Sequence, residues 1–263
     1  MKLEQQYERR EHMFKASFAD AKIWKNLLTA ISTLIEESDF EITPDAMKLR
    51  SMDPSHVAMV DFELQNSAFE SYSCTAPLKI RVNMNSMLKL LRRVGSDEHL
   101  EIVYDEGTKK IEMTLKGKMM RRFTMPTLEP AEEEVPTPKL TFNTRVKMIA
   151  GSLRDMIEDS QAISDNVKFE SSVQKFVVNA SGQLSTATIE LEKGSEALLD
   201  LEVKEPSKAT FNLNYLAEII KAGSTASEVV TVEYSTNMPV RIQFEMPQQG
   251  RLQYYLAPRI EAE

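Results

Sequence analysis

The stretch IRVNMNSMLKLLRRVG, residues 80–95, returns in altered form as TFNLNYLAEIIKAG, residues 210–223. In both copies two asparagines spaced two apart lead into an amphipathic run that ends on glycine. The two glycines, Gly95 and Gly223, lie 128 positions apart. A chain of 263 residues has room for two domains of about 130 residues each. The repeat therefore predicts one fold built twice, which works through its shape.

The predicted helices are segments in which apolar residues recur at helical spacing. They cover residues 21–35, 86–94, 150–164 and 215–222, and Asp20 is the predicted N-cap of the first. Alternating apolar and polar residues predict strands at 40–52, 56–64, 99–106, 109–117, 118–125, 167–172, 175–181, 187–193, 198–204, 227–235, 239–246 and 251–258. Each half is expected to be α+β, with two helices and a larger set of mainly antiparallel strands.

The chain is predicted to divide at residues 126–138. This segment has four prolines and three consecutive glutamates, and its only sizeable apolar residues are Leu128 and Val135. Its composition and length are typical of a connector that crosses a domain surface. Residues 1–12 are polar and charged and are interpreted as a disordered extension or a tag. The expected domains are therefore 13–125 and 139–263.

Composition narrows the class of protein. The single cysteine, Cys74, excludes an intramolecular disulfide and fits a reducing compartment. No apolar run approaches the ~18 residues of a membrane span, and the start of the chain lacks the apolar core of a signal peptide. A soluble, intracellular protein is expected. The net charge of −8 argues against simple coating of nucleic acid, so the distribution of basic residues is more informative than their total.

The sequence lacks recognisable catalytic motifs. Its three histidines stand far apart, and a single cysteine allows no zinc-binding cysteine spacing. The eight glycines form neither a dinucleotide-binding fingerprint nor a phosphate loop. Cys74 lies in an alternating strand, where a small buried hydrophobe is favoured over a nucleophile. We therefore predict no enzyme, metal or cofactor. A hydrolase with an unnoticed carboxylate pair is the alternative from another class.

Three segments together resemble the proliferating cell nuclear antigen family, the sliding clamps of DNA replication. They are LRSMDPSHVAMV (49–60), NSMLKLLRRVG (85–95) and GRLQYYLAPRIE (250–261). Two others, LLDLEVKE (198–205) and NMPVRIQFEMPQQGRL (237–252), are similar to archaeal members, and the resemblance covers residues 13–260. It implies the DNA-clamp fold and a ring-shaped trimer, with six pseudo-repeats around duplex DNA. Helices would line the hole and sheets would form the outer surface.

The first implied site is a basic helix face. Contact with phosphates gives attraction without reading bases, which a sliding protein requires. The resemblance implies this role for Lys25, Lys89, Arg92 and Lys221, and the amphipathic pattern adds Lys22, Arg93, Lys147 and Arg154. An ordinary solvated helix face is the alternative. Asp155 and Glu158 make the third helix more acidic than the resemblance implies, and Ser32 and Asn214 stand where relatives often carry a base, so uneven contact is expected.

The second implied site is a hydrophobic pocket under the connector. In the family, polymerases, ligase, the flap endonuclease and the clamp loader insert a short motif with a glutamine and aromatic anchors, which suits an apolar cavity. The positions are Met52, His56, Val57, Leu128, Val135, Pro239, Tyr255, Leu256, Ala257, Pro258 and Ile260. Alternatively, Leu128 and Val135 only pin the connector to the body, and His56 is a structural turn residue.

The third implied site is a subunit interface formed by two exposed strands, 118–125 and 186–193, that pair head to tail. Lys118, Arg121 and Arg122 are expected to face Glu190 and Glu192. Exposed ion pairs contribute only about 0–1 kcal/mol each, so strand hydrogen bonds and apolar contacts must contribute more. The apolar residues are Met120, Phe123 and Ile189. The alternative is that these charges are simply solvated.

The predicted function is a homotrimeric DNA sliding clamp, a non-enzymatic processivity factor without a cofactor. It would encircle double-stranded DNA without sequence preference and tether DNA polymerase, flap endonuclease and DNA ligase. An ATP-driven clamp loader would open it, because the chain has no nucleotide motif of its own. The expected location is cytoplasmic and nucleoid-associated, or nuclear in a eukaryote, without membrane contact. The runner-up is a subunit of a heterotrimeric or checkpoint-type clamp.

Overall fold

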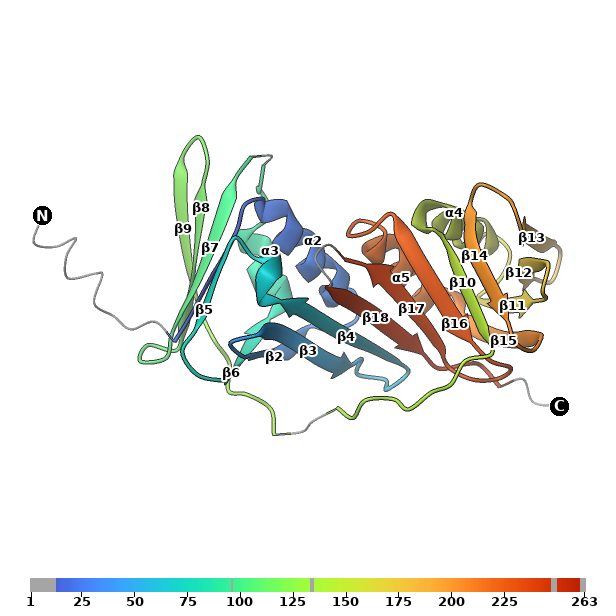
Figure 1. Ribbon diagram of the computed structural model, residues 1–263, viewed down its shortest axis with the longest axis horizontal. Helices are drawn as coiled ribbons and strands as arrows, with labels where there is room; N and C mark the ends of the chain where they lie inside the picture. Colours follow the sequence, from blue (N-terminus) through green and yellow to red (C-terminus); the bar gives the residue numbers. More distant parts are fainter. Residues whose placement is uncertain (1–12, 96, 133–134, 247–249, 261–263) are drawn as a thin grey trace, which may run out of the picture.

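The computed structural model describes residues 13–95, 97–132, 135–246 and 250–260. The predicted extension at 1–12 lies outside these described residues. Figure 1 shows two halves of similar build side by side, with the helices on one side of the sheets. The predicted α+β class is confirmed, and the two halves repeat the same order of elements.

The first half begins with β1 (Phe14–Phe18) and α2 (Ala21–Ser32) and continues through five strands and a short 3-10 helix to α3. These elements are β2 (Glu37–Ile42), β3 (Ala46–Met52), β4 (Ala58–Gln65), η1 (Asn66–Ala68), β5 (Ser71–Cys74), β6 (Leu78–Asn83) and α3 (Met84–Leu90). Three strands complete it: β7 (His99–Asp105), β8 (Lys110–Lys116) and β9 (Met120–Pro126).

The second half repeats this order from β10 (Thr144–Ile149) and α4 (Ala150–Gln161). It continues with β11 (Asn166–Ser171), β12 (Lys175–Ser181), β13 (Thr186–Glu192), β14 (Leu198–Val203), β15 (Ser207–Asn212) and α5 (Leu213–Gly223). It ends with β16 (Val229–Tyr234), β17 (Val240–Glu245) and β18 (Arg251–Leu256). Each element from β10 onward thus has a counterpart in the first half, and β18 corresponds to β9.

The strands of the described residues form three antiparallel sheets. The N-terminal sheet has the order β5-β1-β7-β8-β9, and the C-terminal sheet has the order β13-β12-β11-β15. The central sheet, β14-β10-β16-β17-β18-β4-β3-β2-β6, takes strands from both halves. The halves join where β18 pairs with β4, from Arg251 opposite Glu63 to Leu256 opposite Ala58. One continuous sheet therefore crosses the boundary between the halves.

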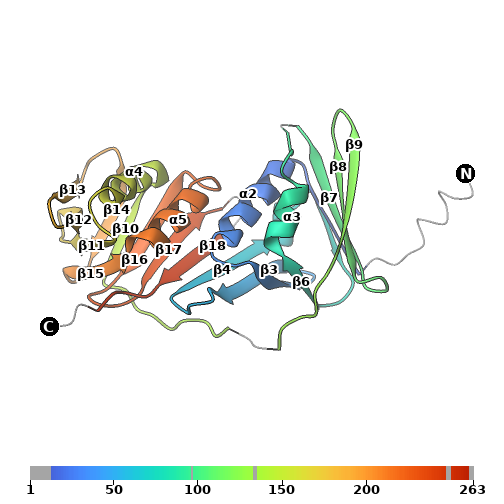
Figure 2. The ribbon, with the colours of Figure 1, turned by 180° about the vertical axis from the view of Figure 1, so that it is seen from behind.

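The helices form a single row, α3, α2, α5, α4, against the sheets (Figure 2). The apolar core lies between this row and the strands. In the first half Trp24 of α2 packs against Phe18 and Phe40, with ring centroids 5.6 and 5.5 Å apart. At the joint between the halves, the Tyr254 hydroxyl of β18 donates to the carbonyl of Ala30 in α2 at 2.8 Å. The halves are thus fastened through both their sheet layer and their helix layer.

Asparagine side chains explain where the repeated helices begin. Asn83 accepts a hydrogen bond from the backbone N–H of Ser86, and Asn212 accepts from those of Asn214 and Tyr215. These N-caps start α3 and α5 two residues before the predicted positions, because asparagine satisfies the free N–H groups of the first turn. Asp20 caps α2 as predicted, through the Lys22 N–H at 2.8 Å.

The strands that the sequence pattern missed are β1, β6, β10 and β15. Each runs into a helix with at most two residues between them. No turn residues separate the two periodicities there, so the strand was absorbed into the helical pattern. The helices α2, α3 and α4 also end three or four residues before their predicted ends, whereas α5 ends one residue after its predicted end.

The two repeated glycines differ in how much space surrounds them. A Cβ at Gly223 would lie 2.1 Å from the Phe244 ring of β17, whereas a Cβ at Gly95 would meet nothing closer than 3.6 Å. Gly223 thus permits close packing of α5 on the central sheet. Replacing it by alanine is expected to lower the free energy of unfolding by about 1–3 kcal/mol, because the ring must move.

Urea denaturation of Gly223→Ala measures this loss. Gly151→Ala in α4 is the matched control, since its Cβ would have no neighbour within 4 Å. The control should be neutral or stabilising by up to about 1 kcal/mol. Equal stabilities for the two variants would contradict the packing argument.

Candidate functional site

The exposed side of α2 and α3 is uniformly basic. Lys22 and Lys25 lie on α2, Lys89 lies on α3, and Arg92 and Arg93 follow α3 directly. Neither helix contains an aspartate or glutamate. The Lys25 ammonium donates to the Arg92 carbonyl at 3.2 Å, which ties the end of α3 to α2. The first half thus concentrates five of the predicted phosphate contacts on one face.

The helices of the second half carry the opposite balance. On α4, Asp155, Glu158 and Asp159 are exposed, and Arg154 lies 3.8 Å from Asp155 and 3.7 Å from Glu158. On α5, Lys221 shares the exposed side with Glu218. Arg154 is thus neutralised by its own helix. The uneven charge expected from the sequence is present, and only the first half offers a basic surface.

Lys147 does not belong to a helix face, which corrects the sequence interpretation. It lies on β10, between Val146 and Met148, which point into the core under the helices. Its ammonium therefore lies on the other side of the central sheet, 2.6 Å from the Glu245 carboxylate. The sequence interpretation extended the helical pattern of α4 back into β10, because this strand ends directly before the helix.

The turn between β3 and β4 carries His56 and Val57 and is organised by the Asp53 carboxylate. One oxygen accepts the backbone N–H groups of Val57 and Ala58, at 2.7 and 2.6 Å. The other accepts the Ser55 N–H at 3.0 Å and the Tyr215 hydroxyl of α5 at 2.8 Å. His56 takes the left-handed conformation, with φ of 55°, which this tight turn requires.

The carboxyl-terminal tail lies against this turn. The Ala257 N–H donates to the Val57 carbonyl at 2.9 Å, and the Arg259 N–H donates to Thr210 of β15 at 2.7 Å. Pro239 immediately precedes Val240, which lies opposite Leu256. The structure therefore gathers most of the predicted pocket around one corner. These residues are Met52, His56, Val57, Pro239, Tyr255, Leu256, Ala257 and Pro258, and Ile260 is 82% exposed beside them.

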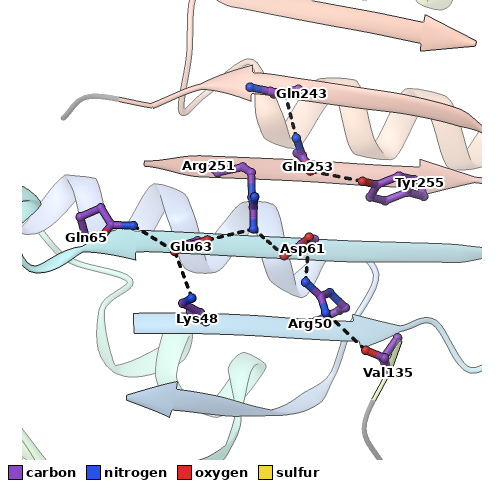
Figure 3. Close-up of polar contacts among 10 residues, drawn as sticks. All are labelled: Lys48, Arg50, Asp61, Glu63, Gln65, Val135, Gln243, Arg251, Gln253 and Tyr255. Carbon is purple, nitrogen blue, oxygen red and sulfur yellow. Dashed lines mark hydrogen bonds and ion pairs between the residues drawn. The ribbon is translucent and has the colours of Figure 1, made fainter. Parts of the chain in front are cut away.

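The two apolar connector residues are each held by a strand of the first half. The Leu128 N–H donates to the Arg81 carbonyl on the edge strand β6 at 2.9 Å. The Val135 carbonyl accepts from the Arg50 guanidinium of β3 at 3.5 Å. Val135 lines a cavity of about 330 Å³ whose walls are mostly charged, and its place in the partner pocket stays a prediction. Figure 3 shows this contact and the polar side chains around it.

The charged side chains near the connector form one chain of ion pairs across the domain joint (Figure 3). Asp61 of β4 accepts from Arg50 at 3.2 Å and lies 3.6 Å from Arg251 of β18. Arg251 also pairs with Glu63 at 2.9 Å, and Glu63 pairs with Lys48 at 3.2 Å. Because these pairs include both β4 and β18, they fasten the two halves as well as the connector.

The two predicted interface strands are both at sheet edges. Among the described residues, β9 ends the N-terminal sheet and β13 ends the C-terminal sheet, at opposite ends of the molecule (Figure 1). Met120 of β9 is 66% exposed, while Phe123 and Ile189 are half-buried. Lys118 and Glu192 are exposed. Both edges are therefore accessible for pairing.

Three of the five charged residues expected to pair between these edges have partners within the subunit. Arg121 donates to both Glu98 carboxylate oxygens at 2.7 Å, and Arg122 lies 3.0 Å from Glu112. Glu190 is bound to Lys175 at 2.7 Å. These three charges thus have partners inside one subunit, and their pairing between subunits stays a prediction. The Gly95 N–H and the Arg121 guanidinium hold the pKa of Glu98 below its ordinary value, against the effect of its burial.

Sequence reasoning missed two residues of the site, Asp53 and Tyr215. The signal for Asp53 was an Asp-Pro-Ser turn with a carboxylate two residues before a free N–H, which is an Asx-turn pattern. Tyr215 had no local signal, because its partner lies 162 residues away.

In the described ranges no group of three or more His, Cys, Asp or Glu side chains could hold a metal ion. None of the helices there is long and apolar enough to span a membrane.

Comparison with known proteins covers both halves of the chain. Residues 13–130 match the family model of the proliferating cell nuclear antigen (PCNA) N-terminal domain, and residues 136–259 match that of its C-terminal domain. DNA polymerase sliding clamp 1 of Pyrobaculum aerophilum is 35% identical over 245 residues, which is 93% of this chain and 98% of that protein. The DNA polymerase sliding clamp of Pyrococcus furiosus is 33% identical, over 94% and 99% of the two chains. The crystal structure of PCNA from Thermococcus kodakaraensis has the same fold, with a TM-score of 0.89 at 24% identity over 94% of this chain and 100% of that one.

The Asp53 carboxylate predicts a pH dependence of stability. Burial raises its pKa, but the hydrogen bonds from Ala58, Tyr215, Ser55 and Val57 lower it more, so the pKa lies below 3.8. A lowered folded-state pKa means that the carboxylate stabilises the fold above about pH 4 and that this contribution is lost as the pH falls through the folded-state pKa. Asp53→Asn should therefore lower the free energy of unfolding by about 1–3 kcal/mol at pH 7.

Urea denaturation between pH 3 and 7, followed by circular dichroism, tests this expectation. The difference between Asp53→Asn and the unmodified protein should shrink below about pH 4. Asp45→Asn, at an exposed turn position, serves as the control and should show no such difference. A difference that is constant with pH would rule out the carboxylate as its cause.

Proposed function

Because the chain belongs to the proliferating cell nuclear antigen family, the DNA polymerase sliding clamps, we propose that it is a homotrimeric ring that encircles duplex DNA. It is a non-enzymatic processivity factor that tethers DNA polymerase, and we extend this to flap endonuclease, DNA ligase and the clamp loader. Its proposed domains are 13–125 and 139–263, joined by the connector 126–138. Its proposed location is the cytoplasm, at the nucleoid, or the nucleus in a eukaryote.

The observation that carries the ring is the internal repeat. Within one chain the last strand of the second half, β18, pairs with β4 of the first half. Their counterparts are β9 in the first half and β13 in the second, and these are the edges at opposite ends of the molecule. A second copy can therefore repeat between subunits the junction that already exists within one. Head-to-tail pairing of this kind generates a closed ring when the rotation closes.

The repeat also specifies the register of the proposed junction. When the residue pairs of the two halves are aligned, Arg121 and Phe123 of β9 occupy the positions of Leu252 and Tyr254 of β18. In the same alignment Ile189 of β13 occupies the position of Phe62 of β4. Since Leu252 lies opposite Phe62, Arg121 would lie opposite Ile189 of the next copy.

The same register orders the outward-facing side chains and the helices. Met120 would lie opposite Glu190, as Arg251 lies opposite Glu63 within the chain. In the helix layer, the internal contact between α2 and α5 would recur between α4 of one copy and α3 of the next. The acidic side of α4 would then face the basic end of α3, whose cleft of about 380 Å³ is lined by Lys89, Leu90, Arg92, Arg93, Arg121 and Phe123. Opposite charges at this junction support the trimer.

DNA binding is supported by the helix row. The basic side of α2 and α3 would recur three times around the ring, alternating with the more acidic α4 and α5. Phosphate contact through lysine and arginine supplies attraction without sequence preference. Contact at Lys22, Lys25, Lys89, Arg92, Arg93 and Lys221 is proposed, while Arg154 and Lys147 are left out because acidic neighbours neutralise them.

Cysteine cross-linking tests the ring and its register together. In a Cys74→Ser background, Met120→Cys with Glu190→Cys should form a disulfide between chains, because facing residues of antiparallel strands have Cα atoms about 4.5–5.5 Å apart. A covalent trimer on a non-reducing gel and a three-chain mass by light scattering are expected. Met120→Cys with Thr186→Cys is the control, since its sites are out of register by about 13 Å. A stable monomer would instead favour a subunit of a heterotrimeric or checkpoint-type clamp.

Retention on DNA tests encirclement. After loading by a clamp loader, the protein should stay on circular DNA and be lost when the circle is linearised, because a ring slides off free ends. Equal retention on linear DNA would refute the proposal.

The basic face is tested by charge removal at low salt without a loader. Lys89→Gln with Arg92→Gln should weaken DNA binding and reduce the slope of log K against log salt by about 0.9 for each phosphate that is no longer neutralised. Lys147→Gln with Lys168→Gln changes the net charge equally on strands of the sheets and should have no such effect. Identical slopes for the two variants would favour the solvated-face alternative.

A further inference from the structure

One side chain from the helix row reaches the turn that carries the proposed partner pocket. The Tyr215 hydroxyl, in the first turn of α5, donates to the Asp53 carboxylate at 2.8 Å. Asp53 belongs to the first half and is only 3% exposed. The bond therefore links a helix of one half to a buried carboxylate of the other.

The Asp53 carboxylate sets the shape of the turn through backbone groups. Its two oxygens accept from the N–H groups of Ser55, Val57 and Ala58. The Val57 carbonyl then accepts from Ala257 of the carboxyl-terminal tail at 2.9 Å. A rotation of the carboxylate would shift Val57 and, through it, the tail. Tyr215 thus acts on two segments of the pocket through the orientation of the whole Asp53 carboxylate.

The internal repeat shows that this bond is not a requirement of the fold. Asn83 corresponds to Asn212, so the counterpart of Tyr215 in α3 is Ser86, which offers its backbone N–H to the cap in the same way. The turn that corresponds to 53–57 runs from β12 to β13 through Gly182, and its sequence SGQLS has no carboxylate. The counterparts of these two positions, in α3 and in the β12–β13 turn, thus fold without a tyrosine or an aspartate. Both appear only at the junction that carries the proposed pocket.

Neighbouring groups hold the Tyr215 side chain so that its hydroxyl keeps donating to Asp53. Its backbone N–H is held by the Asn212 side chain at 3.2 Å, so the base of the side chain is anchored. The hydrogen bond to Asp53 raises the pKa of the tyrosine above 10, so the hydroxyl keeps its proton at neutral pH. Hydrogen bonds to a charged acceptor stabilise more than those between neutral groups.

We propose that Tyr215 is a positioning residue for partner-peptide recognition, holding the Asp53 carboxylate so that the 53–57 turn and the tail keep the shape that receives the peptide. The inference rests on the proposed function, because the pocket is its object. Tyr215 touches no residue of the peptide itself in this role. Without its hydroxyl the turn samples other shapes, and binding must first restore the competent one.

Tyr215→Phe removes only the hydroxyl and is the direct test. The probe is a fluorescent synthetic peptide with a glutamine and two aromatic anchors, titrated by anisotropy against the full chain. Its Kd should rise about threefold to tenfold. Amide hydrogen exchange at Val57 and Ala58 should accelerate, while the light-scattering mass stays unchanged.

Tyr72→Phe is the matched control. The Tyr72 hydroxyl also makes a 2.8 Å bond, to the Thr43 carbonyl, away from this turn. Its loss should leave both peptide affinity and exchange at Val57 as they are. In the Asp53→Asn background, Tyr215→Phe should reduce peptide affinity by a smaller factor than in the unmodified protein, because the two groups act as one unit.

The outcomes separate the two claims. If the unmodified protein binds the peptide and Tyr215→Phe binds equally well, the positioning role is overturned and the proposed function stands. If the unmodified protein does not bind the peptide, the partner pocket itself is refuted, and the positioning role falls with it. Equal losses in Tyr215→Phe and Tyr72→Phe would show a general stability effect and would also overturn the inference.

Discussion

Backbone hydrogen bonds at strand edges organise this molecule. A strand at the edge of a sheet presents N–H and C=O groups that have no strand partner, and this row of groups is a template for pairing with another strand or segment. Inside the chain such pairing occurs between β18 and β4, and it makes one continuous sheet from the two halves. Leu128 covers part of the edge of β6, and Arg259 covers part of the edge of β15. The equivalent edges β9 and β13 have no such cover among the described residues, and the proposed ring follows from that difference.

The two halves share a fold but not a surface. The pattern of apolar residues is under the same constraint in both, because each helix must bury one side against a sheet. The polar sides are free to diverge, and they have done so: the first half exposes lysines and arginines, while α4 exposes Asp155, Glu158 and Asp159. In a ring that alternates the halves, this divergence gives α3 and α4 of neighbouring copies opposite charges. It would also leave the proposed phosphate contacts to α2 and α3, with Lys221 of α5 beside them.

The joint between the halves combines several kinds of contact. Strand pairing supplies the hydrogen bonds, Tyr254 connects β18 to α2, and the Asp61 to Arg251 pair spans β4 and β18. Most of these groups are partly or fully buried, so the surrounding protein screens them less than bulk water would. The turn at Asp53 lies at this joint and inherits its order from it. A recognition surface placed there is held by two domains at once.

The sequence by itself determined the duplication, the α+β class, the Asp20 cap and most of the strands, because apolar periodicity and turn residues are local signals. It also predicted the family, through segments that stand together at fixed spacing. Local signals failed where a strand runs directly into a helix, as at β6 and β10, and this error placed Lys147 on the wrong face. Only the tertiary structure decided which charges were already paired, as for Arg121 with Glu98, and that Tyr215 reaches Asp53. Such contacts join residues far apart in the chain, and their partners are chosen by packing, which sequence periodicity does not record.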